Sequence, residues 1–260
     1  MKTSVIVTTY NWPEALRLCI QSFEKQTYKP SEVIIADDGS KSETAECIAR
    51  LQTEMPFTIK HAWQEDDNFR AARARNLAVK ESSGDYLIFV DGDIIAHPHF
   101  IEDHLSSAKK GVFLQGGRCL MSPDLSESLM GQNTNELGFF TKGILNRKNA
   151  LRLPFLSPFT GSRSNPLKGI RTCNLSLYRS DFESINGFDN RFVGWGREDS
   201  EFAARLKNNN IKRKDLRFKG LAYHIFHEEN SRQSLKENHE RLMKTINESK
   251  TITQDGFSQV

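Results

Sequence analysis

The sequence has few cysteines and no long hydrophobic run. The four cysteines in its 260 residues lie far apart and form no CxxC or Cys/His spacing: Cys19, Cys47, Cys119 and Cys173. This spacing supports neither a zinc site nor a disulfide framework, and it predicts buried free thiols. No apolar stretch approaches the length of a membrane span, and the one at the N-terminus is too short for a signal peptide. We therefore expect a cytoplasmic location.

The chain also lacks a strong excess of charge of either sign. It has 36 Lys and Arg residues against 33 Asp and Glu residues, a formal net charge of +3. This small excess does not indicate nucleic acid as a partner. A weakly basic protein still favours anionic substrates or lipid headgroups.

The first hundred residues alternate between two kinds of pattern. Continuous apolar runs predict strands at 4–9, 32–37, 57–63 and 85–90, and helical spacing predicts helices at 13–26, 42–52 and 70–82. Strict alternation of strands and helices is typical of a parallel sheet covered by helices on both faces. We therefore expect an α/β fold with its ligand site beyond the carboxyl ends of the strands.

Three polar segments follow these strands directly: Thr8–Asn11, Asp37–Ser40 and Asp91–Asp93. The rule for parallel sheets brings all three to one crevice. From about Leu120 the alternation stops, and 121–169 is rich in Ser, Asn, Gly and Pro, which predicts a loop-rich insertion with short helices.

The last ninety residues again contain predicted elements. We expect strands at 170–179 and 218–226 and helices at 198–209 and 234–249, followed by a frayed tail at 251–260. The last of these helices carries Leu235, Leu242, Met243 and Ile246 near one face. That face either docks on the core or rests on anionic lipid.

Asp91 and Asp93 stand on either side of Gly92 at the end of a buried strand. Two carboxylates this close repel one another unless a cation lies between them. Oxygen ligands suit Mg²⁺ or Mn²⁺, with a phosphate completing the coordination. The alternative is a polar turn with solvated aspartates.

A second acidic group, Glu198, Asp199 and Glu201, opens a predicted helix, where capping alone would explain it. The preceding "GWG" contains Trp195, which either stacks on a sugar or belongs to the core. Arg75 and its neighbours at another helix start are either anion ligands or a solvated face. His224 and His227 cannot both face the same way in a regular strand, and a core histidine is the commoner case for such a residue.

Taken together, these segments resemble the family 2 glycosyltransferases. The motifs "VIVTTYN", "IIADDGS", "FRAARARN", "YLIFVDGD", "GIRTCNLSLYR", "GWGREDSEFAARL" and "AYHIFHEEN" occur in the family's order over nearly the whole chain. The resemblance implies the A-type glycosyltransferase fold, a Rossmann-like, mostly parallel sheet flanked by helices, with a loop-rich acceptor-binding second half. It implies one domain, 1–260, with a nucleotide-sugar half at 1–95, an acceptor and catalytic half at 96–230, and a C-terminal helix and tail at 231–260.

The resemblance also implies how the donor binds. Thr8 and Tyr10 match positions that frame the nucleoside, Asp38 matches the residue that hydrogen-bonds uracil, and Arg75 matches a basic residue near the nucleotide. Asp91 and Asp93 match the DxD motif, which holds Mn²⁺ or Mg²⁺ on the diphosphate. A histidine completes the metal site in such relatives, and His224 fits that spacing better than His227.

The second half resembles the subgroup of bacterial chondroitin polymerases and animal β-1,4-galactosyltransferases. There the matching motif supplies the acceptor site and the catalytic base, which implies Asp199 as base, with Glu198 beside it and Trp195 and Arg197 at the acceptor. Arg197 replaces a glycine found in several relatives.

The function implied is an inverting, metal-dependent transfer of a hexose or N-acetylhexosamine from a UDP-sugar to a glycan or lipid-linked glycan. Bacterial surface polysaccharide or lipopolysaccharide synthesis, in the cytoplasm and in peripheral contact with the inner membrane, is the expected setting. The alternatives are an inactive nucleotide-sugar or glycan-binding module and a nucleotidyltransferase. The first would be favoured by replacement of Asp91, Asp93 or Asp199. The second would be favoured by a Gly-rich basic loop after the first strand, where this chain has "TTYNWPEA".

Overall fold

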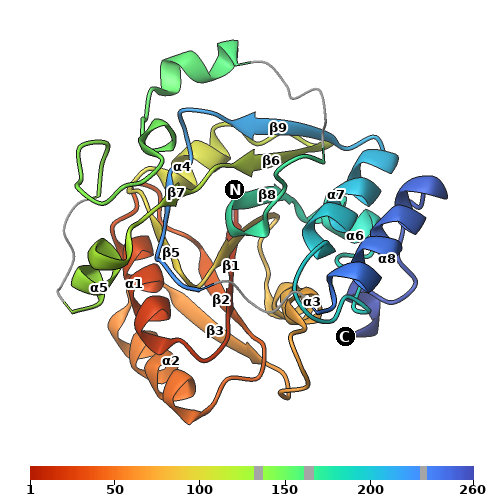
Figure 1. Ribbon diagram of the computed structural model, residues 1–260, viewed down its shortest axis with the longest axis horizontal. Coiled ribbons are helices and arrows are strands. Elements are labelled where there is room, and N and C mark those ends of the chain that lie inside the picture. The colour runs from red at the N-terminus through yellow and green to blue at the C-terminus, as the bar shows by residue number, and fades with distance from the viewer. Residues whose placement is uncertain (132–136, 161–166, 229–232) are drawn as a thin grey trace.

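A seven-stranded sheet forms the centre of the molecule. The computed structural model describes residues 1–131, 137–160, 167–228 and 233–260 (Figure 1). The strands lie in the order β3-β2-β1-β4-β8-β6-β9. Their bounds are β1 Thr3–Thr9, β2 Glu32–Asp37, β3 Thr58–Trp63, β4 Tyr86–Asp91, β6 Val112–Gly116, β8 Leu175–Tyr178 and β9 Lys212–Leu216.

Strands β1 to β4 pair in parallel, as the alternating pattern predicts. In that register Thr8 of β1 lies between Ala36 of β2 and Asp91 of β4. Strand β8 is antiparallel to both β4 and β6, and β9 is parallel to β6. The sheet is therefore mostly parallel, and the polar segments after β1, β2 and β4 emerge from one edge.

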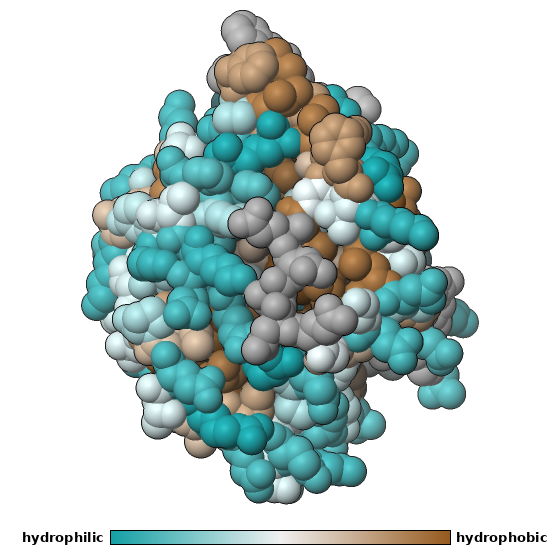
Figure 2. Space-filling view, turned by 90° about the vertical axis from the view of Figure 1, so that its left-hand side faces the viewer, coloured by the Kyte–Doolittle hydropathy of each residue, from teal (hydrophilic) through white to brown (hydrophobic). Residues whose placement is uncertain are grey.

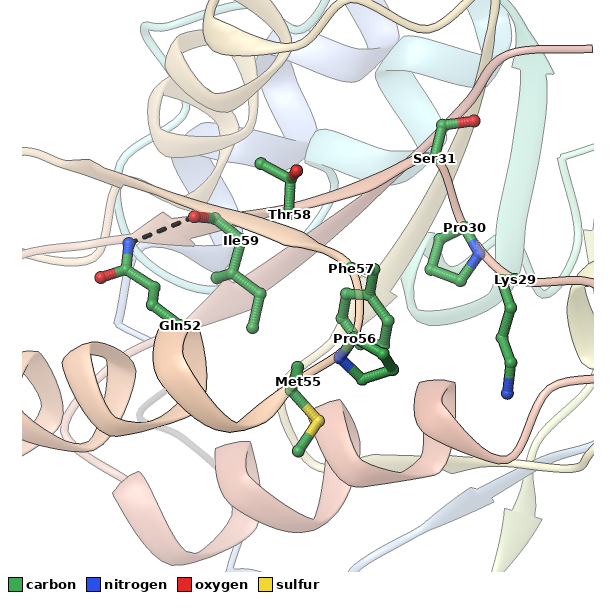
Figure 3. Close-up of a pocket in the computed structure, with 9 residues that line it drawn as sticks. All are labelled: Lys29, Pro30, Ser31, Gln52, Met55, Pro56, Phe57, Thr58 and Ile59. Carbon is green, nitrogen blue, oxygen red and sulfur yellow. Dashed lines mark hydrogen bonds between the residues drawn. The ribbon is translucent and has the colours of Figure 1, made fainter.

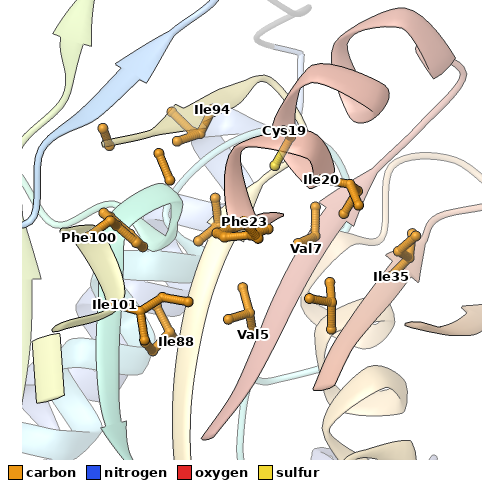
Figure 4. Close-up of a cluster of buried hydrophobic side chains, with 14 of the residues drawn as sticks. Val5, Val7, Cys19, Ile20, Phe23, Ile35, Ile88, Ile94, Phe100 and Ile101 are labelled. Atoms are coloured by element: carbon orange, nitrogen blue, oxygen red, sulfur yellow. The ribbon is translucent and has the colours of Figure 1, made fainter. Parts of the chain in front are cut away.

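Helices cover both faces of this sheet. Alternation along β1 places Val5 and Val7 on one face and Ile6 on the other. The first face packs against α1 (Pro13–Glu24) and α2 (Ser42–Glu54), and Figure 4 shows Phe23 of α1 seated over β1. The second face packs against α3 (Ala71–Glu81), α6 (Arg179–Ser184) and α7 (Glu198–Asn208). The prediction of a doubly covered α/β sheet is confirmed.

A small second sheet lies beside the main one. Its strands are β5 (Ile94–Ala96), β10 (Ala222–His224) and β7 (Cys119–Leu120), with β10 in the middle. The pairing places His224 opposite Ile94, and the Ile225 N–H donates to the carbonyl of Asp93 at 2.9 Å. These three short strands therefore bring the end of the DxD segment next to a histidine from far along the chain.

The remaining elements are short, with one exception. They are α4 (Phe100–Leu105), α5 (Pro123–Gly131), α8 (Leu235–Asn247) and the 3-10 turns η1 (Arg147–Asn149), η2 (Pro154–Phe159), η3 (Thr172–Asn174) and η4 (Phe257–Gln259). The predicted insertion at 121–169 is loop-rich with short helices where it is described; 132–136 and 161–166 lie outside the described residues. Within the described chain, no helix is long and apolar enough to cross a membrane. All four cysteines are buried free thiols, as predicted.

Helix α8 docks on the rest of the protein, but the buried face is only partly the predicted one. Asn238, Leu242 and Thr245 are buried, whereas Met243 and Ile246 are exposed. The Asn238 side chain donates to the Val193 carbonyl at 3.1 Å, and the Thr245 hydroxyl donates to Glu201 at 3.0 Å. These polar contacts determine which face of α8 is buried, and hydrophobic spacing does not reveal them.

The prediction of a frayed tail is wrong. Residues 251–260 return to the body, where the Phe257 ring packs edge-on against Phe182 at 5.6 Å between centroids. The Asn186 carbonyl accepts from the Phe257 N–H at 2.8 Å, and its side-chain amide donates to the Thr253 carbonyl at 3.1 Å. Asn186 thus pairs with the tail's backbone, which holds the tail against the body.

Candidate active site

The loops after β1 and β2 are joined by hydrogen bonds. The Asp38 N–H donates to the Thr9 carbonyl at 3.1 Å, and the Asn11 N–H donates to the Ser40 hydroxyl at 2.9 Å. The side chain of Asn11 in turn accepts from the Lys41 N–H at 2.8 Å. Two of the three polar segments therefore form one wall of a crevice, as expected from the parallel sheet.

Asp38 is buried in this wall and held by two donors. The Gln64 amide donates to one carboxylate oxygen at 2.5 Å, and the Arg70 N–H donates to the other at 2.7 Å. Burial raises the pKa of Asp38 to about 6, although both hydrogen bonds oppose the shift. Tyr10 stands exposed nearby, with its hydroxyl 3.1 Å from Asp66. The pair could receive a flat, hydrogen-bonding ring.

The third polar segment makes a tight turn at Gly92. The Gly92 N–H donates to the Thr8 carbonyl at 2.7 Å, and a Cβ at position 92 would lie only 3.1 Å from that same oxygen. Glycine lets the two backbones approach this closely without displacing either one. The carboxylates on either side of the turn have different partners, so Asp91 and Asp93 do not form one simple pair.

Asp93 belongs to a cluster of possible metal ligands with His224 and His227. Their donor atoms all lie within 4.8 Å of one another, and one carboxylate oxygen of Asp93 is 3.3 Å from His224 and 3.2 Å from His227. Burial opposes ionisation, but hydrogen bonds from the two histidines lower the pKa of Asp93. Its other oxygen is buried without a hydrogen-bond partner among the described residues. A carboxylate and two imidazoles with a spare buried lone pair fit a divalent cation.

Both histidines reach Asp93 because strand β10 ends at His224. In a continuous strand, residues three apart point to opposite faces. The observed strand is shorter than the predicted 218–226, so His227 lies in irregular backbone and turns back towards Asp93. Sequence reasoning favoured His224 and left His227 as its alternative; the structure brings in both.

Arg75, on α3, lies between Asp91 at the end of β4 and the two carboxylates at the start of α7. Its guanidinium is 3.3 Å from Asp91, 3.6 Å from Glu198 and 3.7 Å from Asp199, and its Nε donates to the Thr8 hydroxyl at 3.0 Å. The side chain is buried, and burial opposes a pKa increase that the three carboxylates nonetheless produce. A single cation thus holds three acidic groups from two distant parts of the chain in one site.

The two carboxylates at the start of α7 differ in environment. Asp199 accepts from both the hydroxyl and the N–H of Thr172, at 2.8 and 3.1 Å. Burial, followed by repulsion from Asp199, raises the pKa of Glu198 to about 7 against the opposing effect of Arg75. Asp91 responds in the same way, since burial raises its pKa to about 6 despite Arg75. Two hydrogen-bond donors therefore hold the Asp199 carboxylate, whereas the pKa of the Glu198 carboxyl is raised to near neutral pH.

Glu201, which the sequence grouped with these two, points into the core. It forms a bidentate ion pair with Arg205 at 2.8 and 2.7 Å, and both side chains are almost fully buried. Arg205 also donates to the carbonyls of Ile185 and Gly187. Glu201 therefore braces α7 and takes no part in the site.

The loop before α7 has an unusual backbone. Gly194, Gly196 and Arg197 have φ values of +75°, +102° and +79°. A side chain at position 194 would collide with Ser234, but Arg197 occupies the left-handed region with a side chain of its own. This conformation costs about 1–2 kcal/mol for a non-glycine residue. Arg197 and Trp195 are both exposed there, beside Glu198.

Two residues of the site have no predicted role. Gln64 holds Asp38, and Thr172 holds Asp199. Thr172 stands inside the quoted motif "GIRTCNLSLYR", so its position was available from the sequence although its partner was not.

A pocket on the surface of the described residues lies away from this site. It has a volume of about 650 Å³ and is lined by Lys29, Pro30, Ser31, Gln52, Met55, Pro56, Phe57, Thr58 and Ile59 (Figure 3). These residues surround the starts of β2 and β3, whereas the crevice lies beyond the ends of those strands. The pocket contains no carboxylate or histidine and is unrelated to the site.

Models of two known protein families match this chain, one after the other along the sequence. The model of glycosyl transferase family 2 matches residues 4–164. The chain belongs to this family. A second model, described as the N-terminal domain of galactosyltransferase, matches residues 160–228. The predicted resemblance to family 2 and to galactosyltransferases is confirmed.

Named relatives of this family 2 glycosyltransferase support the assignment. Validoxylamine A glucosyltransferase of Streptomyces hygroscopicus subsp. limoneus is 31% identical over 223 residues, which are 80% of this chain and 48% of the relative. Chondroitin synthase of Pasteurella multocida (strain Pm70) is 27% identical over 78% of this chain and 22% of the synthase. The chain spans about half the length of the first and less of the second.

Solved structures confirm the A-type fold. S. aureus TarS 1-349 in complex with UDP-GlcNAc has a TM-score of 0.64 and 18% identity, covering 96% of this chain and 66% of that one. The mannosyltransferase PcManGT from Pyrobaculum calidifontis, in complex with GDP-Man and Mn²⁺, has a TM-score of 0.60 and 17% identity, covering 96% and 69%. The one fold thus accepts two different nucleotides.

Proposed function

We propose that this family 2 glycosyltransferase transfers a hexose or N-acetylhexosamine from a UDP-sugar to a glycan or lipid-linked glycan, with inversion at the anomeric carbon. The observation that carries the proposal is Arg75, which joins Asp91 on the strand edge to Glu198 and Asp199 on α7. Arg75 contacts Asp91 on the side proposed to bind the nucleotide and two carboxylates on α7. Its positive charge therefore lies between these groups, where charge develops during sugar transfer.

Asp93, His224 and His227 would hold the divalent metal, with Asp91 close by. When bound, Mn²⁺ or Mg²⁺ supplies positive charge to a diphosphate leaving group. Two imidazole nitrogens favour Mn²⁺ over Mg²⁺ in this set. The Mn²⁺ in the PcManGT complex supports use of a divalent metal on this fold.

The wall formed by Thr8, Tyr10 and Asp38 would hold the nucleoside. An ionised Asp38 accepts hydrogen bonds, and the ring N–H of uracil donates one. Gln64 and the Arg70 N–H fix the carboxylate and leave lone pairs free, because each oxygen takes only one of the two bonds. The UDP-GlcNAc complex of TarS supports a uridine nucleotide, while its N-acetylglucosamine is one of several candidate sugars.

Asp199 would act as the general base on the acceptor hydroxyl. Thr172 orients its carboxylate with two hydrogen bonds, which leaves further lone pairs for the acceptor proton. Arg75 offsets the negative charge left on the diphosphate as the acceptor oxygen attacks from the opposite face. Trp195 and Arg197 would contact the acceptor, and Glu198 would hold it beside the base.

Synthesis of a bacterial surface polysaccharide, capsule or lipopolysaccharide is the setting that we propose, on the cytoplasmic face of the inner membrane. The chondroitin synthase relative supports polysaccharide synthesis. The transfer assay described next is the experiment that identifies the acceptor and the linkage position.

The test is a panel of UDP-sugars, assayed with the purified chain for donor hydrolysis and for transfer to glycan acceptors. We expect activity with at least one UDP-sugar in Mn²⁺, loss of activity in excess chelator, and recovery on adding Mn²⁺. Asp93→Asn should weaken Mn²⁺-dependent donor binding at least tenfold, since it removes the one carboxylate of the cluster. Asp124→Asn, on the exposed start of α5, is the matched control and should behave as the parent does. Full activity in chelator would refute the metal proposal, and no turnover of any nucleotide sugar would refute the function.

A further inference from the structure

The outer surface of residues 137–160 exposes large apolar side chains. Phe140, Phe155 and Leu145 are 88%, 67% and 63% exposed, the three highest values for large apolar residues in the described chain, and Leu156 is exposed beside them. Figure 1 shows η2 projecting above the main sheet, and Figure 2 shows apolar side chains gathered at the top of the corresponding face. Apolar side chains gathered in this way indicate an interaction surface.

The segment that carries these side chains is fixed to the body. Ile144 is buried and bridges to Met121, and the Leu145 N–H donates to the Leu120 carbonyl at 2.9 Å. Arg147 donates to the Phe139 carbonyl at 3.0 Å. The exposure of the apolar residues therefore comes from a folded segment with a buried inner side and an apolar outer side.

The charged residues of this segment are all basic. Residues 137–160 contain no Asp or Glu, and their basic residues are Lys142, Arg147, Lys148 and Arg152. Lys142, Arg147 and Lys148 are exposed, whereas Arg152 is paired with Asp103 at 2.7 Å. Aromatic and leucine side chains beside exposed basic side chains match the interface of an anionic bilayer, which offers hydrocarbon beneath a layer of negative headgroups.

We propose that this surface, formed by Phe140, Leu145, Phe155, Leu156, Lys142, Arg147 and Lys148, rests on an anionic lipid bilayer. Charge favours this partner over a second copy of the chain, because a symmetric contact would bring like charges together. Helix α8 fits lipid less well. No apolar side chain of this helix is as exposed as Phe140, Phe155 or Leu145, since Met243 and Ile246 are 38% and 37% exposed, and Arg241 is already paired with Glu237.

Two short strands connect this surface to the candidate active site. Leu145 is hydrogen-bonded to Leu120 of β7, and β7 pairs with β10, which carries His224. Docking would therefore hold the crevice at a fixed orientation to the bilayer. That orientation suits a lipid-linked acceptor, a consequence that rests on the proposed function, whereas the docking itself does not.

Flotation with vesicles of equal parts phosphatidylglycerol and phosphatidylcholine tests the proposal. The chain should float with these vesicles at low salt, less at high salt, and weakly with pure phosphatidylcholine. Phe140→Ser with Phe155→Ser should lower vesicle binding by about tenfold for each phenylalanine removed. Lys142→Glu with Lys148→Glu should remove the salt-sensitive part. All these side chains are exposed, so melting temperature and donor hydrolysis in solution should not change.

Met243→Ser with Ile246→Ser on α8 is the matched control and should bind vesicles as the parent does. The proposal is overturned if the parent does not bind anionic vesicles at low salt, or if the α8 variant loses binding while the Phe140 and Phe155 variant keeps it. It is also overturned if light scattering shows a lipid-free dimer that the phenylalanine substitutions convert to monomer, since the surface would then join two copies.

Discussion

Arg75 determines how the acidic groups of the crevice can coexist. Asp91, Glu198 and Asp199 all lie within 3.7 Å of its guanidinium, and without a cation they would repel one another. Burial still raises the pKa of Asp91 to about 6 and that of Glu198 to about 7. Keeping all three carboxylates ionised therefore costs free energy, and a bound cation or a proton lowers that cost.

Residue chemistry alone predicted the carboxylates and not their partners. Paired carboxylates at a strand end and at a helix start are visible in one sequence, because type and spacing are local. The contacts of Arg75 with Glu198 and of Thr172 with Asp199 join distant segments, and no local pattern contains them. Glu201 shows the same limit, since its burial against Arg205 separates it from two neighbours of the same chemistry.

Asp199→Asn separates catalysis from helix capping. The substitution keeps the shape but removes the basicity: the amide oxygen can accept from the Thr172 N–H, and the amide N–H can donate to the Thr172 hydroxyl. If Asp199 is the base, transfer to the acceptor should fall by about 10²–10⁴-fold, while donor binding is unchanged and the melting temperature falls by only a few degrees. Transfer kinetics, donor titration and thermal melting measure the three quantities.

Glu198→Gln is the matched control. The amide resembles the protonated carboxyl that burial already favours at this position, so the chemical step should change less than in Asp199→Asn. Retained turnover in Asp199→Asn together with its loss in Glu198→Gln would move the base by one residue. A loss of stability in both without a loss of rate would make the acidic pair a helix cap.

At the scale of elements, continuous runs were predictable and short strands were not. β1, β2 and β4 read as strands because each is a run of mostly apolar residues buried on both faces. β5, β7 and β10 have two or three residues each, too few for any periodicity, yet they position Asp93 and His224. The polar strand β9, "KRKDL", lies at the sheet edge, where burial imposes little pattern.

Glu32, at the start of β2, ties several elements together and should govern acid stability. It is buried and accepts from the hydroxyls of Ser4 and Ser83 at 2.6 and 2.9 Å, and it pairs with Lys60 of β3 at 3.0 Å. Burial alone would raise the pKa of Glu32, but these partners lower it from 4.5 to about 2. Because the folded-state pKa is the lower one, this stabilisation is complete above the unfolded-state pKa and is lost as pH falls towards 2.

Glu32→Gln should therefore lower the free energy of unfolding by about 3 kcal/mol at neutral pH. Urea unfolding across a pH series should show the gap between variant and parent closing below about pH 4, as the parent's carboxylate becomes protonated. Glu46→Gln, exposed on α2, is the control and should change neither quantity. A gap that stays constant with pH would mean that Glu32 contributes through packing and not through its charge.

At the scale of the whole molecule, two cores flank one sheet, and the chain's last residues belong to the second core. That core contains Phe89, Phe182, Phe188 and Phe202, with Phe257 of the tail packed against it. Fraying of 251–260 was predicted from its place at the chain terminus, and that position does not reveal the hydrogen-bond partners that Asn186 supplies. The doubly covered sheet was predictable from alternation, whereas the closing of the tail over it depends on contacts between distant segments.

Gly256→Ala tests whether the tail is part of the fold. A Cβ at this position would lie 2.1 Å from the Asn186 carbonyl oxygen, so the tail would have to move away from the body. Displacing it should cost about 1–3 kcal/mol in the free energy of unfolding, measured by urea unfolding, and should speed amide exchange of Phe257, whose N–H donates to that same carbonyl. Gly131→Ala is the matched control, because no atom of the described residues outside its local helix lies within 4 Å of an added Cβ there. Equal stability of Gly256→Ala and the parent would instead support the frayed tail that its place at the chain terminus predicts.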